Sequence, residues 1–310
     1  MELEINGMSR AKASRQTMKC SVVILTFNSA ATVEHTVKAA QSVSDDIYVV
    51  DSYSTDGTVD VVRRMGAEVV QHEFKNYAVQ RNWAIDNLPL RHRWQLHLDA
   101  DEYLSEALIN EMKGLDESPA DGISGYYIPR RVRFLGRTIR HGGMYPIWHL
   151  RLFVGDKGRC EDREYDQHFY IEGEAGKLRN CMVDDQQMTL SEWTARHNRW
   201  SDAEARQIID ASGSSIIQGK WSGSPVQRKR RLRGLYYRAP AFVRAFGLFF
   251  YRYILRRGFL DGKAGLVFFV LQTFWFRFLV DAKLYEEELA GAKADEALGY
   301  KEEKRARISN

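Results

Sequence analysis

Cysteine is scarce in this chain, and its placement excludes two common ways of stabilising a protein. Among 310 residues there are three cysteines, Cys20, Cys160 and Cys181, an odd number without Cys-x-x-Cys spacing. A disulfide framework and a zinc knuckle both need paired or closely spaced cysteines. The first nineteen residues are polar and basic without an apolar stretch. No secretory signal is therefore expected, and the cytoplasm is the expected compartment.

Two glycine-rich phosphate-binding motifs are also missing. The first apolar run, residues 20–26, is not followed by Gly-x-Gly-x-x-Gly, and the chain has no Gly-Lys-Ser/Thr sequence. These absences exclude the dinucleotide fingerprint and the P-loop. If the sheet binds a diphosphate without either motif, the expected alternative is a metal ion bound by carboxylates.

The N-terminal half has a pattern that predicts regularly alternating strands and helices. The composition, 44% hydrophobic and 28% charged, is typical of a globular chain, and the net charge of +4 is a mild excess. Apolar runs predict strands over 20–26, 47–51, 67–71 and 94–98, with amphipathic helical patterns between them. This alternation predicts an α/β fold with a doubly wound, mostly parallel sheet.

Polar residues follow several of these predicted strands. Asn28 comes after the first, Asp51 ends the second, and Asp99 and Asp101 follow the fourth. Ligands of parallel sheets bind beyond the carboxyl ends of the strands, so these side chains are expected to converge on one crevice. The alternative is that Asn28 and Asp51 only cap helices.

The sequence Asp99-Ala-Asp101 has the spacing of a cation site. Two carboxylates at i and i+2, where a strand becomes a loop, can reach one hard cation together. Mg²⁺ and Mn²⁺ prefer oxygen ligands and share them with phosphate and water. The pair therefore predicts a divalent metal site, with a solvated acidic turn or a helix N-cap as the alternative.

Four ordered motifs resemble one known family. They lie at residues 21–28 (Ser-Val-Val-Ile-Leu-Thr-Phe-Asn), 49–58 (Val-Val-Asp-Ser-Tyr-Ser-Thr-Asp-Gly-Thr), 77–82 (Tyr-Ala-Val-Gln-Arg-Asn) and 98–102 (Leu-Asp-Ala-Asp-Glu). Together they resemble the family 2 glycosyltransferases of GT-A fold, closest to the bacterial branch that builds lipopolysaccharide core and exopolysaccharide. The likeness continues through residues 134–146 and 151–153, and less closely to about residue 200.

This resemblance implies roles for individual residues. Thr26 and Asp51 would contact the uracil or ribose of a nucleotide sugar, and Arg81 would approach the base or a phosphate. Asp99 would lie near the ribose and the metal, and Asp101 would coordinate the metal that bridges the diphosphate. The cation would neutralise the charge that builds on the leaving nucleoside diphosphate. Members of the family invert the anomeric centre, which requires a base for the acceptor hydroxyl.

The acceptor side is expected after residue 119. A strand is predicted over residues 125–129, and a series of arginines follows it: Arg130, Arg131, Arg133, Arg137 and Arg140. These arginines predict a positive wall for diphosphate or an acidic acceptor, or else a solvated strand face. His141, next to two glycines, is expected to contribute to the nucleotide-sugar site, with a structural role as the alternative.

The general base is expected between residues 158 and 168. The relatives have Val-His-Glu where this chain has Tyr-Asp-Gln at residues 165–167, a departure from the family pattern. Asp166 occupies the matching place and has His168 as a neighbour that could tune it, so it is the favoured base. Asp162 and His168 are the next catalytic candidates, and Glu161 and Glu164 of the same segment are also candidates. A strand continuing with period 2 would place Asp166 and His168 on one face; alternatively, these charges pair with nearby arginines.

The C-terminal third changes in composition. A helix or helix pair over 191–209 is expected to pack on the catalytic domain. A basic cluster at 228–233 is followed by two aromatic-rich apolar stretches, 239–255 and 264–280, joined by 256–262. Each stretch is short for a spanning helix and contains arginine. Basic flanks and aromatic residues favour helices lying in a membrane interface, with core or oligomer helices and a spanning hairpin as alternatives.

The whole chain therefore predicts a flexible lead (1–18), a GT-A domain (19–215), membrane-associated helices (226–285) and a charged tail (286–310). Within the GT-A domain, 19–118 is the nucleotide-sugar half and 119–215 the acceptor half. The expected function is metal-dependent, inverting transfer of a sugar from a UDP-type donor to a lipid-linked glycan at the cytoplasmic membrane face. Polyprenyl phosphate is an alternative acceptor. A nucleic-acid-binding module using residues 228–233 and an inactive partner subunit are non-catalytic alternatives; the aromatic helices favour lipid, so nucleic acid is not expected.

Overall fold

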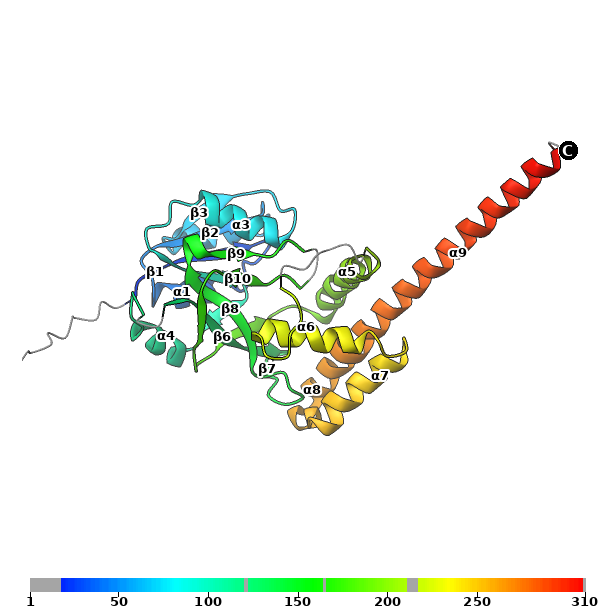
Figure 1. Ribbon diagram of the computed structural model, residues 1–310. Helices are drawn as coiled ribbons and strands as arrows, with labels where there is room; N and C mark the ends of the chain where they lie inside the picture. The colour runs from blue at the N-terminus through cyan, green and yellow to red at the C-terminus, as the bar shows by residue number, and fades with distance from the viewer. Residues whose placement is uncertain (1–17, 120–121, 164–165, 211–216, 309–310) are drawn as a thin grey trace, which may run out of the picture.

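A computed structural model describes residues 18–119, 122–163, 166–210 and 217–308. Within them, a ten-stranded sheet has the order β3-β2-β1-β4-β8-β6-β12-β5, and β7 and β11 also pair with β6 (Figure 1). Its strands are β1 (Cys20–Thr26), β2 (Ile47–Asp51), β3 (Glu68–Gln71), β4 (Trp94–Asp99), β5 (Glu102–Leu104), β6 (Ile123–Phe134), β7 (Arg137–Thr138), β8 (Ile147–Val154), β11 (Glu174–Lys177) and β12 (Met182–Gln186). A separate hairpin pairs β9 (Gly158–Cys160) with β10 (Phe169–Ile171).

The parallel half of the sheet follows the apolar runs of the sequence. Strands β3, β2, β1 and β4 are parallel neighbours, as predicted, and β3 begins one residue later than expected. The helices that connect them are α1 (Val33–Gln41), α2 (Thr58–Arg64) and α3 (Tyr77–Asn87). Asn76 caps α3 because its side chain accepts a hydrogen bond from the Val79 N–H at 2.8 Å.

Residues alternate between the two faces of β1, as the pleat of a strand requires. Val22 and Ile24 pack with α1, α2 and α4 (Glu106–Lys113) on one face. Val23 and Leu25 pack with α3 on the other. The sheet is thus covered by helices on both faces, which is the predicted doubly wound arrangement.

Antiparallel strands complete the second half of the sheet. β8 lies between β4 and β6 and is antiparallel to both, whereas β12 and β11 are parallel to β6. The strand expected over 125–129 is the middle of the longer β6. Because β8 runs beside β4, it brings Arg151 to the carboxyl end of β4, where the acidic motif lies.

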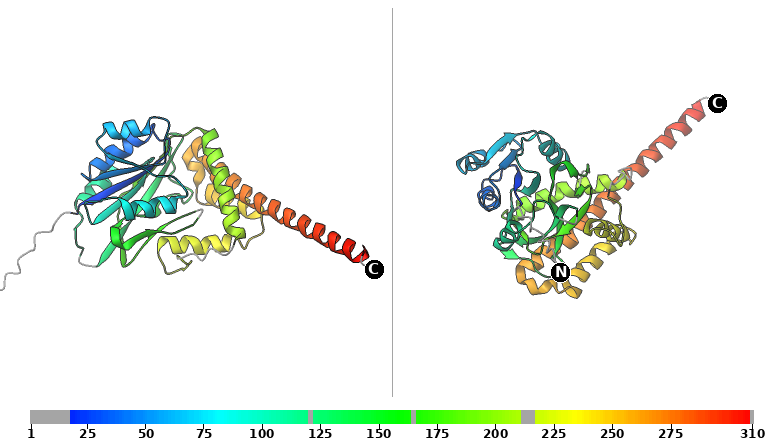
Figure 2. Two further views of the ribbon diagram at one scale, coloured as in Figure 1. Left: turned by 90° about the horizontal axis from the view of Figure 1, so that it is seen from above. Right: turned by 60° about the vertical axis from the view of Figure 1, so that its left-hand side comes forward.

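Helices make up the C-terminal third (Figure 2). They are α5 (Leu190–Ile209), α6 (Pro225–Tyr236), α7 (Val243–Phe250) with a π-helical end (Tyr251–Leu255), a 3₁₀ turn (Gly258–Asp261), α8 (Gly262–Phe269) with a π-helical end (Val270–Trp275), and α9 (Phe276–Ile308). Residues 191–209 lie in one helix, and its fully buried Trp193 packs against Phe134 of the sheet, as expected of a packing helix. The charged residues after 285 continue α9, which extends away from the body of the molecule.

Candidate active site

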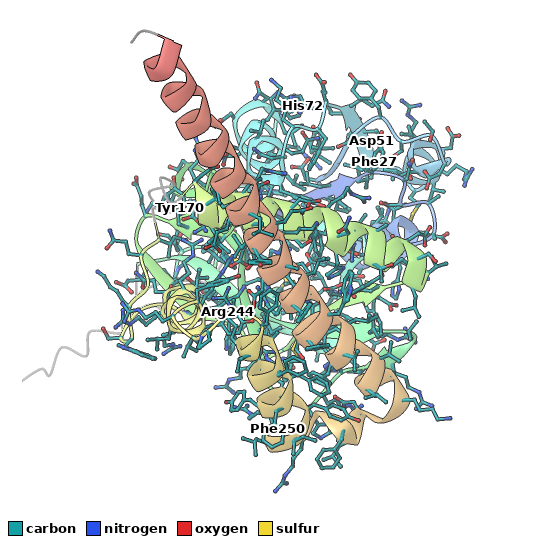
Figure 3. The ribbon with its side chains drawn as sticks, turned by 90° about the vertical axis from the view of Figure 1, so that its right-hand side faces the viewer. Phe27, Asp51, His72, Tyr170, Arg244 and Phe250 are labelled. Atoms are coloured by element: carbon teal, nitrogen blue, oxygen red, sulfur yellow. The ribbon has the colours of Figure 1, made fainter. Side chains whose placement is uncertain are left out.

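The carboxyl ends of β1, β2 and β4 bring three of the predicted residues together. Thr26 is opposite Asp51 in the pairing of β1 with β2, and Leu25 is opposite Asp99 in the pairing of β1 with β4. The Thr26 hydroxyl donates a hydrogen bond to Asp51 Oδ1 at 3.0 Å. This edge is the candidate active site, and Asp51 is labelled there in Figure 3.

Asp51 is fully buried and organises the loop that follows β2. Besides Thr26, its carboxylate accepts hydrogen bonds from the Ser54 N–H at 2.9 Å and the Ser54 hydroxyl at 2.5 Å. Gln71 Nε2 donates to it at 3.3 Å. With several donors on both oxygens, Asp51 holds the loop in place. It does not cap α2, whose N-cap is Gly57.

Asn28 joins the loops after β1 and β2. It has a left-handed backbone (φ 47°); its N–H donates to Ser54 Oγ at 2.8 Å, and its side-chain oxygen accepts from the Thr55 N–H at 2.9 Å. The helix-cap alternative is wrong here as well, because Thr32 is the N-cap of α1. Asn28 therefore fixes the relation of the two loops.

Two aromatic side chains stand exposed on these joined loops. Phe27 is 62% exposed and Tyr53 is 56% exposed, and Tyr53 has a φ of 59°. The sequence reasoning assigned neither a role. The sequence did contain a signal for them. A large apolar residue just beyond the carboxyl end of a buried strand lies outside the core and at the edge of the sheet where a ligand would bind.

Asp99 lies between two arginines. Arg81 of α3 pairs with its Oδ1, and Arg151 of β8 donates to its Oδ2 at 2.8 Å. Burial opposes ionisation of this carboxyl, but the two guanidinium groups outweigh burial and hold the pKa of Asp99 at about 2. Asp99 is therefore a permanent anion. Arg151 belongs to a motif of the resemblance, but only the fold placed it beside Asp99.

Asp101 is in a different electrostatic environment. The nearest cation to its carboxylate is Arg196 of α5, at 3.9 Å. Burial, together with the neighbouring carboxylates Asp184 and Asp99, raises the pKa of Asp101 well above its ordinary value. An ionised Asp101 is thus incompletely compensated by the protein, and a divalent cation beside it would remove the imbalance.

The two carboxylates fit a metal unequally. Both Asp99 oxygens already accept from arginine. The Asp101 side chain is 25% exposed, and its one ion pair within the described part of the chain is the distant one to Arg196. Within the described ranges, no group of three or more His, Cys, Asp or Glu side chains could enclose a metal ion. A cation here would therefore be held by Asp101 and take its other ligands from a bound phosphate and water, which suits Mg²⁺ or Mn²⁺.

Buried nitrogen donors surround this acidic motif. Arg151 also bonds to Glu102, which is 1% exposed, at 2.8 Å, and Arg130 pairs with Asp184 at 3.2 Å. Among the residues that the structure describes, several buried nitrogens at the site find no hydrogen-bond partner: Arg81 Nη1, Arg130 Nε, Arg151 Nε and Arg196 Nε. Buried donors left unpaired are costly, and arginines are suited to binding an anion.

The predicted base lies in a loop held by ion pairs. Asp166, with a φ of 58°, pairs with Lys229 at 2.7 Å, Arg233 at 3.2 Å and His168 at 3.3 Å. Burial would raise its pKa, but Lys229 and His168 outweigh burial and hold the pKa of Asp166 well below its ordinary value. Asp162 is exposed. The expected extension of the strand through this loop is wrong for its described residues, because β9 ends at 160 and β10 starts at 169.

The basic cluster at 228–233 is used partly inside the protein. On α6, Lys229 and Arg233 pair with Asp166, and Arg230 pairs with the buried Glu161. Arg233 also reaches Glu204 of α5 at 2.7 Å. These cations therefore fasten α6 to the loop that carries the predicted base, which the linear pattern of charges could not indicate.

His141 is tied to the C-terminal helices. Its Nδ1 lies 2.7 Å from Asp261 Oδ1, and its backbone N–H donates to Asp261 Oδ2 at 2.9 Å. The adjacent Gly142 has a φ of 66°, and a Cβ there would lie 2.1 Å from the Phe269 ring. Gly142 therefore allows close contact between this loop and α8. The bonds of His141 to Asp261 fit the structural role that was its alternative.

Comparison with known proteins agrees with this architecture. Residues 21–167 match the model of glycosyl transferase family 2. An uncharacterized glycosyltransferase of Rickettsia bellii is 37% identical over 97 residues, 31% of this chain and 32% of the relative, so the match spans about a third of the relative's length. The lipopolysaccharide core biosynthesis glycosyltransferase LpsC of Rhizobium meliloti is 24% identical over 267 residues, covering 82% of this chain and 88% of LpsC.

A solved structure shares the fold. The mannosyltransferase PcManGT from Pyrobaculum calidifontis, in complex with GDP-Man and Mn²⁺, superposes with a TM-score of 0.50 at 16% identity, covering 87% of each chain. At this identity the likeness concerns the fold alone. The order of the motifs, the sheet topology and the family match agree, and residues 21–167 are therefore a glycosyl transferase family 2 domain of GT-A fold.

Proposed function

We propose that this protein transfers a sugar from a nucleoside-diphosphate sugar, a UDP-sugar, to a lipid-linked glycan of lipopolysaccharide or exopolysaccharide biosynthesis. The transfer is metal-dependent and inverts the anomeric centre. One observation carries the proposal. At the carboxyl end of β4, the poorly compensated carboxylate of Asp101 lies beside buried arginines that retain unpaired donors. A diphosphate with a divalent cation satisfies both requirements at once.

The donor is placed by the loops after β1 and β2. The exposed rings of Phe27 and Tyr53 offer stacking surfaces for a nucleobase, and the Asp51 network keeps their loops in position. The nucleoside thus lies over the ends of β1 and β2, and the diphosphate reaches Arg81 and Arg151. Asp101 would hold the metal ion, which would supply positive charge against the negative charge that develops on the leaving diphosphate. Arginine donors that are already in position stabilise the same charge without reorganisation.

Asp166 is the proposed base for the acceptor hydroxyl. Its ion pairs keep the carboxylate deprotonated, but they also weaken it as a base, so the acceptor has to displace Lys229 before Asp166 can take the proton. Asp162 and His168 remain the alternatives within the same loop. Asp166→Asn, Asp162→Asn and His168→Gln separate the three, because loss of the base lowers kcat for transfer by about 100-fold or more with donor binding unchanged.

A lipid-linked acceptor is supported by the C-terminal helices. Their exposed aromatic and aliphatic side chains suit attachment to the cytoplasmic face of the inner membrane, where such an acceptor is anchored. LpsC, which is similar over most of this chain, is a lipopolysaccharide core biosynthesis glycosyltransferase, and this agrees with the proposed acceptor class.

The test is donor hydrolysis by detergent-solubilised protein across UDP-, GDP- and dTDP-sugars, with Mg²⁺ or Mn²⁺ and with EDTA. Metal-dependent release of one nucleotide, lost in Asp101→Ala, is the expected result and identifies the donor. Glu106→Ala, at an exposed position on α4, is the matched control. Absence of turnover and of metal-dependent nucleotide binding with every donor would overturn the proposal.

A further inference from the structure

We infer that the hairpin formed by α7, α8 and the turns between them docks on an anionic bilayer surface from one side only. In this arrangement the apolar helix Gly258–Ala292, which begins inside the hairpin, does not cross the membrane. The inference rests on the membrane location in the proposed function and is independent of the sugar that is transferred. It specifies the lipid class and the mode of attachment.

The hairpin, residues 239–275, exposes an unusual amount of apolar surface. In α7, Val243, Phe246 and Phe250 are 65%, 56% and 55% exposed, and in the turn region Leu255 and Leu260 are 62% and 54% exposed. Phe250 lies at the end of the molecule remote from Asp51 in Figure 3. An exposed apolar patch of this kind marks a surface that meets another apolar phase.

Exposed charge on the hairpin has one sign. Between residues 239 and 280 the one acidic residue is Asp261. Its side chain is 4% exposed and is engaged by His141. Arg256, Arg257 and Lys263, at the bend of the hairpin, are exposed. Cations around an apolar tip complement anionic lipid headgroups, whereas a protein partner of ordinary composition would not need this uniform sign.

The helix Gly258–Ala292 is long and apolar enough to cross a membrane by length and composition. Three of its polar residues, however, are bound to α5: Gln272, Arg277 and Lys283. Arg277 pairs with Glu204 of α5 at 2.7 Å. Asp281 is bound to the start of the hairpin, where it accepts from Arg244 Nε at 2.9 Å and from the Phe242 N–H at 2.7 Å.

These contacts oppose a transmembrane arrangement. α5 carries charged residues along its length, so it cannot follow α9 into the lipid core. If Gly258–Ala292 crossed the membrane, Arg277 would lose its partner Glu204 within hydrocarbon, which is costly for a charged side chain. Docking of the hairpin leaves every one of these bonds intact. The apolar tip can then enter the headgroup region while α5 and α9 stay outside.

Vesicle binding tests the lipid surface. The full-length protein is sedimented with phosphatidylcholine vesicles with and without phosphatidylglycerol, over a range of salt concentrations. Binding should need the anionic lipid and weaken with salt. Phe246→Ser/Phe250→Ser should lower partitioning by about 100-fold, roughly tenfold per half-exposed ring. Arg257→Gln/Lys263→Gln should weaken the salt dependence. The control is Ile209→Ser, at an apolar site at the end of α5 that is 49% exposed, and this variant should bind normally.

Topology is tested by cysteine labelling, which is favoured because the native Cys20, Cys160 and Cys181 are all buried. Glu288→Cys, on the exposed face of α9, and Glu106→Cys, in the catalytic domain, are labelled with an impermeant maleimide in inverted membrane vesicles. Both positions should react from the cytoplasmic side. Protection of position 288 with labelling of position 106 would show a spanning helix and overturn the inference.

The outcomes separate this inference from the proposed function. Equal binding to neutral and anionic vesicles, or full binding by the Phe246/Phe250 variant, overturns the docking surface even if donor hydrolysis is normal. Conversely, loss of vesicle binding in that variant with hydrolysis of a soluble donor retained supports the docking surface. A protein that docks as described but turns over no donor supports the inference and refutes the enzyme.

Discussion

Replacing Asp101 by asparagine should stabilise the metal-free protein and abolish its response to metal. In the structure, the carboxylate is partly buried beside Asp184 and Asp99, and its closest cation is 3.9 Å away on Arg196. At an effective dielectric constant of about 20, a charge pair at that distance contributes roughly 4 kcal/mol. The raised pKa of Asp101 means that burial and the other carboxylates still outweigh this attraction. Removing the charge therefore relieves a net penalty.

The expected gain is about 1 kcal/mol, the usual scale for relieving a functional-site constraint. In a chain of this size it corresponds to a rise in Tm of about 2 °C. The sign of the pH dependence follows from the raised pKa. Protonation of Asp101 contributes stability that is fully present below the pKa of the unfolded chain and is lost as pH rises through the folded pKa. The advantage of Asp101→Asn should therefore be greatest at neutral pH and vanish in acid.

Thermal unfolding tests both the stabilisation of the metal-free protein and the loss of its response to metal. It is measured in EDTA and with Mn²⁺ plus UDP. The wild-type protein should gain stability from Mn²⁺ and UDP by mass action, whereas the variant should gain little. Glu106→Gln, an exposed carboxylate on α4, controls for loss of charge alone. A variant that is less stable than wild type in EDTA, or that keeps the full metal-dependent shift, would refute the reasoning.

Three further predictions test neighbouring parts of the molecule. Arg151→Met should lower the free energy of unfolding in urea by about 3–5 kcal/mol, because it leaves the buried Glu102 without its ion-pair partner. Adding Glu102→Gln should recover part of that loss. If the effects of the two substitutions simply add, the two residues are not coupled. Phe27→Ala should raise the Kd for UDP about tenfold, measured by calorimetry, since a stacked base contributes about 1–3 kcal/mol; an unchanged Kd would place the base elsewhere. Gly142→Ala should destabilise by about 1–3 kcal/mol, because its Cβ would meet a phenylalanine ring at 2.1 Å. Gly247→Ala, with open space around it, is the control, and equal stability of the two variants would show that the loop contact is unimportant.

Local sequence was enough to predict the parallel half of the fold. Continuous apolar runs specify strands that are buried on both faces, so β1, β2 and β4 could be placed almost to the residue. Parallel strands end at a common edge, and for that reason the approach of Asp51 to Asp99 was also predictable. The insertion of β8, antiparallel, between β4 and β6 could not be predicted. Which strands pair depends on packing between residues far apart in the chain, and a local hydrophobic pattern does not contain that information.

Tertiary structure alone decided what each charge does. Asp99 and Asp101 are two residues apart in an acidic motif, yet arginines from α3 and β8 bind the first and other carboxylates surround the second. Likewise, residues 228–233 form a basic cluster in the sequence, but Arg230 forms a buried ion pair with Glu161. The charge of a side chain is fixed by its type, whereas its pKa and its partner depend on groups that folding brings from distant positions in the chain. The sequence by itself therefore determined the family motifs and the parallel half of the fold, and the tertiary structure decided which charged residues are paired and which are left to meet a ligand.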